Sequence, residues 1–136
     1  MASTAPETTL FKRIDHFEVV PRNVERTLRF YLDVLGFRLK ERYPVAKPPM
    51  KEVIYVTLGD TMLEIIDVEN PASVHPDPWH VGWRGMALEV PDMARAVAYL
   101  ATKGVVPSKA PVDLGTSIRA EIEDPDGLMI ELREWK

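Results

Sequence analysis

The sequence contains no cysteine, which excludes a disulfide framework, a thiol nucleophile and a thiolate metal site. No apolar run approaches the roughly 20 residues that a membrane span needs. The opening segment, MASTAPETTLFKR, lacks the apolar core of a signal peptide. The formal net charge of −4 argues against nucleic acid, which binds a basic surface. We therefore expect a cytoplasmic protein with no membrane or nucleic-acid partner.

The remaining composition is that of an ordinary globular protein. Hydrophobic residues make up 46% of the 136 residues and charged residues 28%, so the chain can build a core and keep a polar surface. A chain of this length fits one compact domain or two very small halves.

The first half of the chain predicts the order strand, helix, strand, strand, strand. IDHFEVV (14–20) is rich in β-forming residues, and Asn23 can cap a helix whose apolar face recurs through 24–35. Gly36 fits the left-handed position just past that helix. Three strand-like runs follow, FRLKERY (37–43), KEVIYVTL (51–58) and TMLEIIDV (61–68). A Gly-Asp turn between the last two predicts a hairpin.

The same order recurs after a linker rich in proline and small residues. WRGMALEV (83–90) is strand-like, Asp92 can cap a helix over 93–101, and Gly104 can end it. Three further strand-like runs follow, VVPSKAPVDLG (105–115), TSIRAEIE (116–123) and LMIELREW (128–135). A DPDG turn precedes the last of them.

The spacing indicates that the two halves are a true repeat. Gly85 follows His16 by 69 residues, Asp92 follows Asn23 by the same 69, and the two closing strands carry glutamates at matching positions. Neither half can bury a sheet face alone, so we predict that they pair. The first module covers about 10–69, the linker about 70–82 and the second module about 83–136.

These modules resemble the vicinal oxygen chelate superfamily, the group of glyoxalase I, methylmalonyl-CoA epimerase, extradiol dioxygenases and bleomycin-binding resistance proteins. The resemblance runs from about Ile14 to Trp135 and is most specific in IDHFEVV, ERTLRFYLDVLGF and DPDGLMIEL. It implies an α+β fold in a single domain over 1–136. Two paired β-α-β-β-β modules would form a cupped, mostly antiparallel sheet around a cavity, in a chain that forms a homodimer.

The resemblance also implies a divalent metal at the bottom of the cavity. The usual ligands are His, Glu or Gln, His and Glu. His16 matches the first, Glu64 the second and Glu131 the fourth, whereas Gly85 occupies the third position and has no side chain to offer. One imidazole and two carboxylates suit Zn, Ni, Co, Mn or Fe, and three protein ligands with open positions are typical of a catalytic site. His80, in the linker, is a candidate substitute ligand.

Each of these residues also has a structural interpretation, which leaves open that no metal binds. Glu131 can pair with Arg133 on the same strand face. A buried Glu64 needs a partner, because an unpaired buried charge is costly, but that partner need not be a metal. Trp83 could fill the space opposite Gly85 or pack the linker against the sheet.

The first candidate function is a metal-dependent lyase, isomerase or epimerase acting on a small, enolisable carbonyl substrate. The metal would stabilise the developing enediolate. The resemblance to glyoxalase I implies that Glu131, or otherwise Glu64, would move the α-proton as a general base, and Glu18 and Glu89 are further acid–base candidates. Arg119 could pair with an anionic substrate.

Three other functions are left open. A metal-free protein that binds a bleomycin-type antibiotic is favoured by the missing ligand at Gly85, and its Trp83 could stack on a planar ligand. Ring-cleaving dioxygenase chemistry is disfavoured, because this chain keeps only one of the two histidines of those sites. A degenerate regulatory subunit is a further alternative that nothing in the sequence demands. Glu18, Trp83 and Arg119 are the candidate substrate-binding residues.

Overall fold

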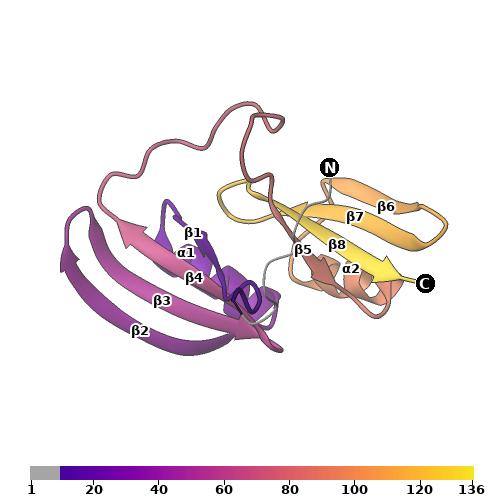
Figure 1. Cartoon of the computed structure of the whole chain (residues 1–136). Coiled ribbons are helices and arrows are strands. Elements are labelled where there is room, and N and C mark those ends of the chain that lie inside the picture. Colours follow the sequence, from indigo (N-terminus) through magenta and orange to yellow (C-terminus); the bar gives the residue numbers. More distant parts are fainter. Residues whose placement is uncertain (1–9) are drawn as a thin grey trace, which may run out of the picture.

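The computed structural model describes residues 10–136, and it contains two four-stranded sheets with the order β1-β4-β3-β2 and β5-β8-β7-β6 (Figure 1). The first module consists of β1 (Phe17–Val19), α1 (Val24–Arg29), the π-helical turn η1 (Phe30–Val34), β2 (Arg38–Lys47), β3 (Met50–Leu58) and β4 (Thr61–Val68). The second consists of β5 (Met86–Glu89), α2 (Met93–Thr102), β6 (Lys109–Asp113), β7 (Ser117–Glu123) and β8 (Met129–Trp135). The predicted α+β class and repeated strand order are confirmed.

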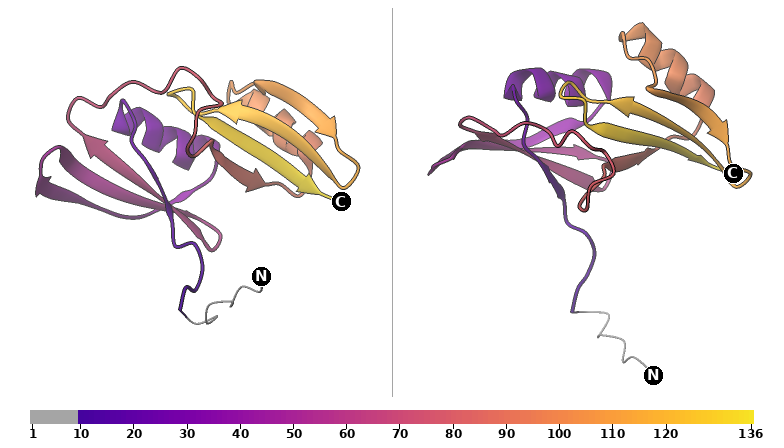
Figure 2. Two further views of the ribbon diagram at one scale, coloured as in Figure 1. Left: turned by 45° about the horizontal axis from the view of Figure 1, so that its top comes forward. Right: turned by 90° about the horizontal axis from the view of Figure 1, so that it is seen from above.

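Each sheet combines one parallel ladder with two antiparallel ones. The β1–β4 and β5–β8 pairs are parallel, and the pairs β2–β3, β3–β4, β6–β7 and β7–β8 are antiparallel. The two sheets lie side by side with edge strands β1 and β5 at the junction, and α1 and α2 cover the same side of the pair (Figures 1 and 2). Among residues 10–136, no helix lies on the opposite side of either sheet, which is called the helix-free face below.

The core lies between each sheet and its helix. Its fully buried side chains include Ile54, Ile65, Ile122 and Ile130. Because successive strand residues point to opposite faces, the residues next to these core positions lie on the helix-free face. That face therefore receives the polar side chains of the strands.

Helix boundaries follow the predicted caps. Asn23 Oδ1 accepts a hydrogen bond from Arg26 N at 3.0 Å, and Asp92 Oδ1 does the same for Arg95 N. Gly36, just past η1, adopts a φ of +81°, the left-handed conformation that glycine takes without a steric penalty. Within residues 10–136, no helix combines the length and the apolar composition that a membrane crossing would need.

The strands differ from the prediction mainly in length. The first covers Phe17–Val19 instead of 14–20, because its ladder with β4 has three residue pairs. In contrast, β2 continues to Lys47 past the predicted end at residue 43 and includes Pro44, with an irregular register after it. Pro111 is tolerated inside β6 because β6 is an edge strand.

Candidate metal centre

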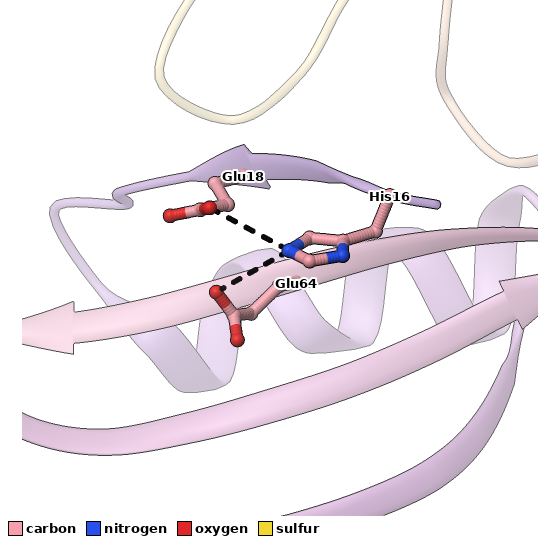
Figure 3. Close-up of side chains that lie close together, drawn as sticks. All are labelled: His16, Glu18 and Glu64. Atoms are coloured by element: carbon pink, nitrogen blue, oxygen red, sulfur yellow. Dashed lines mark ion pairs between the residues drawn. The ribbon is translucent and has the colours of Figure 1, made fainter. Parts of the chain in front are cut away.

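Three metal-ligating side chains meet where β1 lies beside β4 (Figure 3). The parallel ladder pairs Glu18 with Glu64, and His16, two residues before Glu18, shares its face. His16 Nε2 lies 3.5 Å from Glu18 Oε2 and 3.9 Å from Glu64 Oε2. One ligand atom from each residue lies within 4.8 Å of the other two, so the three could close on one divalent ion.

Asp15 orients the histidine. Its Oδ2 lies 2.8 Å from His16 Nδ1, which leaves Nε2 directed at the two glutamates. A carboxylate behind a histidine fixes the ring orientation and tautomer in many metal sites. The hydrogen bond that His16 Nδ1 donates to Asp15 raises the pKa of His16, and the charges of Glu64 and Glu18 act in the same direction.

Glu64 is a buried carboxylate on the helix-free face. It is 8% exposed and alternates with Leu63 and Ile65, which are both in the core. Its partner across the β3–β4 ladder is Tyr55, whose hydroxyl hydrogen-bonds to it. That bond, together with one to Tyr43, raises the pKa of Tyr55. Tyr55 therefore brings no positive charge to Glu64, and the nearest group that can carry one is His16, whose Nε2 lies 3.9 Å from Glu64 Oε2.

The cluster opens on a cavity of about 610 Å³ at the junction of the two sheets. His16 and Glu18 line it from the first module, and Trp83, Arg84 and Gly85 line it from the segment ahead of β5. Most of the remaining lining is apolar. This volume and this mixture of surfaces are typical of a site for a small molecule.

Glu131 occupies the equivalent position in the second sheet but has different neighbours. Arg119 Nε lies 2.5 Å from its Oε1, and Arg133 Nη2 lies 3.0 Å from its Oε2. The structure thus realises the pairing with Arg133 that the sequence offered as the alternative to metal binding. Within this chain, Glu131 does not join His16 and Glu64 in the described cluster, and its role as a ligand stays a prediction.

Gly85 has no room for a side chain. A Cβ built on it would lie 2.6 Å from the Met129 carbonyl oxygen and 2.8 Å from Met129 Cε. Met129, rather than Trp83 or His80, therefore fills the position where the resemblance places a histidine. This packing gives a physical reason for the missing third ligand.

The other predicted residues lie apart from the cluster or at its edge. His80 stacks on His75 with ring centroids 4.2 Å apart, and its Nδ1 lies 2.7 Å from the Asp77 carbonyl oxygen. Trp83 lines the cavity, is 86% exposed and meets Phe17 edge to face. Arg119 is engaged with Glu131, as described above. Glu89 is exposed on β5.

The sequence analysis did not predict the roles that three residues have in this site. Glu18 was predicted as an acid–base or substrate-binding candidate, and its His-x-Glu spacing from His16 also fits a ligand. Asp15 is adjacent to the histidine, but only the structure shows its hydrogen bond. Tyr55 depends on the strand register, for which the sequence has no local signal.

Comparison with known proteins identifies the family. A model of the Glyoxalase/Bleomycin resistance protein/Dioxygenase superfamily matches residues 13–132. The chain belongs to this superfamily. A lactoylglutathione lyase of Neisseria meningitidis serogroup A is 33% identical over 129 residues, which cover 91% of each chain.

Solved structures of the superfamily share the fold. A glyoxalase family protein from Enterococcus faecalis superposes with a TM-score of 0.77 at 26% identity, over 91% of this chain and 98% of that one. TnmS3, an antibiotic-binding protein from Streptomyces sp. CB03234, superposes with a TM-score of 0.74 at 22% identity, over 93% and 98% of the two chains. The superfamily thus includes both catalysts and ligand binders, and the chemistry of the site must decide between them.

Proposed function

We propose that this protein is a metal-assisted lyase, isomerase or epimerase acting on a small substrate with an enolisable carbonyl. The observation that carries the proposal is the direction of His16 Nε2, which Asp15 holds toward two carboxylates beside a cavity. The lactoylglutathione lyase relative supports this class of reaction. The donor set, one imidazole and two carboxylates, fits Zn, Ni, Co, Mn or Fe.

His16 and Glu64 would hold the ion, with Glu18 as the third ligand of the same chain. A divalent ion bound there would polarise the substrate carbonyl and make the neighbouring C–H more acidic. A carboxylate would then accept the α-proton. Glu18, whose side chain is 58% exposed, can approach a substrate in the cavity, whereas the buried Glu64 is held by Tyr55.

We further propose a cytoplasmic homodimer in which a second copy covers the helix-free faces. Ile14 and Trp83 line the cavity at the junction and are 73% and 86% exposed, and Trp79 and Val81, in the segment ahead of Trp83, are 71% and 104% exposed. Apolar side chains exposed together are typical of an interface. In such a dimer, Glu131 could approach the His16 cluster of the partner and serve as the ligand or base that the resemblance implies. Sedimentation of the purified protein tests the dimer.

Metal analysis of protein purified without chelator tests the proposed function. We expect about one transition metal per chain, lost in His16→Ala and Glu64→Gln. Glu89→Gln is a matched control, because it removes an exposed strand carboxylate outside the cluster. Wild-type protein that takes up none of Mn, Co, Ni or Zn would refute the proposal.

Two further variants separate the possible third ligands. If Glu18 is the ligand, Glu18→Gln weakens metal binding and Glu131→Gln leaves it unchanged. The reverse result would assign the ligand to Glu131 and so require a second copy or a rearrangement of its two arginines.

A metal-free antibiotic-binding protein is the second candidate. It is favoured by the packing of Met129 against Gly85, which removes one ligand position, and by the exposed ring of Trp83 at the cavity. The fold of the antibiotic-binding protein TnmS3 is compatible with it. Titration of metal-free protein with bleomycin should then quench tryptophan fluorescence, and Trp83→Leu should abolish most of the change.

A further inference from the structure

We propose that Arg84 is the anion-recognition residue of the cavity, and that the substrate carries a carboxylate or a phosphate in addition to its carbonyl. The inference rests on the proposed function, because it concerns the same cavity. It adds a substrate class and a specificity-determining residue outside the metal cluster.

Arg84 is placed and held for this role. It lines the cavity together with His16 and Glu18, from the opposite module. Its guanidinium carbon lies 4.2 Å from the centroid of the Trp79 ring. Stacking on an aromatic ring fixes the plane of a guanidinium while leaving its edge donors available.

Some N–H donors of the Arg84 guanidinium have no hydrogen-bond acceptor among the described residues. Its Nε is buried and has no hydrogen-bond partner among the described residues. Its Nη2 lies 3.7 Å from Glu121 Oε2, which is close enough for an ion pair but too long for a hydrogen bond. A buried donor without a partner is costly, and a ligand that accepts from the guanidinium would remove part of that cost.

Glu121 carries one negative charge and has three cationic neighbours, so it cannot neutralise all of them. Its Oε2 lies 2.6 Å from Arg119 Nη2, and the cations of Arg84 and Lys109 share the same oxygen at 3.7 and 3.9 Å. Since Arg119 is closest, positive charge remains at Arg84. The cavity is thus lined by the carboxylate of Glu18, next to the buried Glu64, on one module and by the cation of Arg84 on the other.

This charge distribution selects a two-ended substrate. The neutral carbonyl oxygen of the substrate would lie toward the His16 cluster. The anionic group of the substrate would avoid that end of the cavity, because the carboxylate of Glu18 repels it when no ion is bound. A carboxylate or phosphate would bind the guanidinium, whose planar edge matches two acceptor oxygens. Small oxo acids and phosphorylated carbonyl compounds have this chemistry.

The experiment measures anion binding in metal-free, chelator-treated protein. Inorganic phosphate and pyruvate are the probes, and methyl pyruvate is the uncharged control. The three tryptophans give three indole N–H signals in a ¹H–¹⁵N NMR spectrum. Trp79 stacks on Arg84 and Trp83 precedes it, whereas Trp135 lies over Arg133 with its ring centroid 5.1 Å from that guanidinium.

We expect saturable shifts of Trp79 and Trp83 with an anion, no shift of Trp135, and no response to methyl pyruvate. Arg84→Gln should weaken binding roughly tenfold or more, because it removes a charge-assisted hydrogen bond. Arg84→Lys, which keeps the charge but loses the planar edge, should weaken it less. Arg95→Gln on α2, an exposed arginine on the helix side, should bind like wild type.

Unchanged anion binding in Arg84→Gln would overturn the proposal, as would shifts confined to Trp135 or no saturable response in wild type. If Arg84→Gln did not fold, as judged by circular dichroism, the affinity of Arg84→Lys would decide in the same way. Metal uptake separates the two proposals. Arg84→Gln should still bind metal, since Arg84 is outside the cluster, whereas failure of the proposed function would appear as a wild type that binds anions but no metal.

Discussion

Replacing Gly85 with alanine should destabilise the protein, although alanine is the smallest possible addition. The new Cβ would lie 2.6 Å from the carbonyl oxygen of Met129, and real Cβ contacts are essentially never shorter than 3.0 Å. This oxygen belongs to the backbone of Met129, so it cannot move aside as a flexible side chain would. Met129 also directly precedes Ile130, which pairs with Met86 in the β5–β8 ladder. The strands must therefore separate, and overpacking of this kind costs about 1–3 kcal/mol. For a chain of this size we expect Tm to fall by roughly 3–5 °C for each kcal/mol.

The assay is urea unfolding followed by circular dichroism, with Tm as a second measure. Met129→Ala removes the flexible part of the contact but leaves the carbonyl oxygen in place. The double variant Gly85→Ala/Met129→Ala should therefore remain less stable than Met129→Ala alone. If Gly85→Ala stays within about 0.5 kcal/mol of wild type, the range of an ordinary surface change, the steric explanation for the missing ligand is wrong.

Three other predictions follow from the same structure. Asp15→Asn should lower the pKa of His16 in metal-free protein, because the hydrogen bond that His16 donates to Asp15 is the main cause of the increase of this pKa above 6.5; NMR titration measures it. Because His16 has a higher pKa in the folded state than in the unfolded state, its protonation stabilises the folded protein at low pH. This stabilisation is lost as the pH rises through the folded-state pKa of His16, and Asp15→Asn should reduce the change in stability over that pH range. Asn23→Ala should cost about 1 kcal/mol by urea unfolding, through loss of the N-cap. Ile54→Ala, at a fully buried position, should cost about 2–5 kcal/mol, and a smaller loss would mean that the core closes around the gap.

Local sequence patterns predicted most of the fold, because each one has a physical cause close by in the chain. Asn23 and Asp92 cap their helices as expected, since a short polar side chain can reach a backbone N–H three residues on. The turn at Gly59 was also correct, and β3 and β4 meet across it. Strand ends were less predictable, since they depend on the length of the partner strand, as the short β1 shows.

The candidate site was predictable only in part. His16 and Glu64 were predicted as ligands from the resemblance of their motifs to the superfamily, and the structure brings them together. The assignment of Glu131 as their companion depended on how the modules pair, which no local pattern encodes. Similarly, the contact of Gly85 with Met129 joins residues far apart in the sequence. Sequence patterns show that the histidine is missing, whereas the packing shows why.

The two equivalent glutamates, Glu64 and Glu131, have neighbours of opposite charge. Glu64 is flanked across its ladders by Glu18 and Tyr55, and Glu131 by Ala87 and Glu121. In the first sheet, the tyrosine brings no charge and the second glutamate adds negative charge, and His16 is the neighbouring group that can carry positive charge. In the second sheet, Arg119 and Arg133 supply positive charge directly to the glutamate.

The same strand register therefore produces opposite charge balances. A metal added to the second sheet would have to displace two guanidinium groups, and each would lose a charge-assisted pair. An anion added to the first sheet would face two carboxylates. A substrate with an oxygen for a metal at one end and an anionic group at the other satisfies both surfaces. Tyr55→Arg would place a positive charge beside Glu64, as Arg119 and Arg133 do for Glu131. This variant should abolish metal uptake, measured by metal analysis, although all the proposed ligands remain.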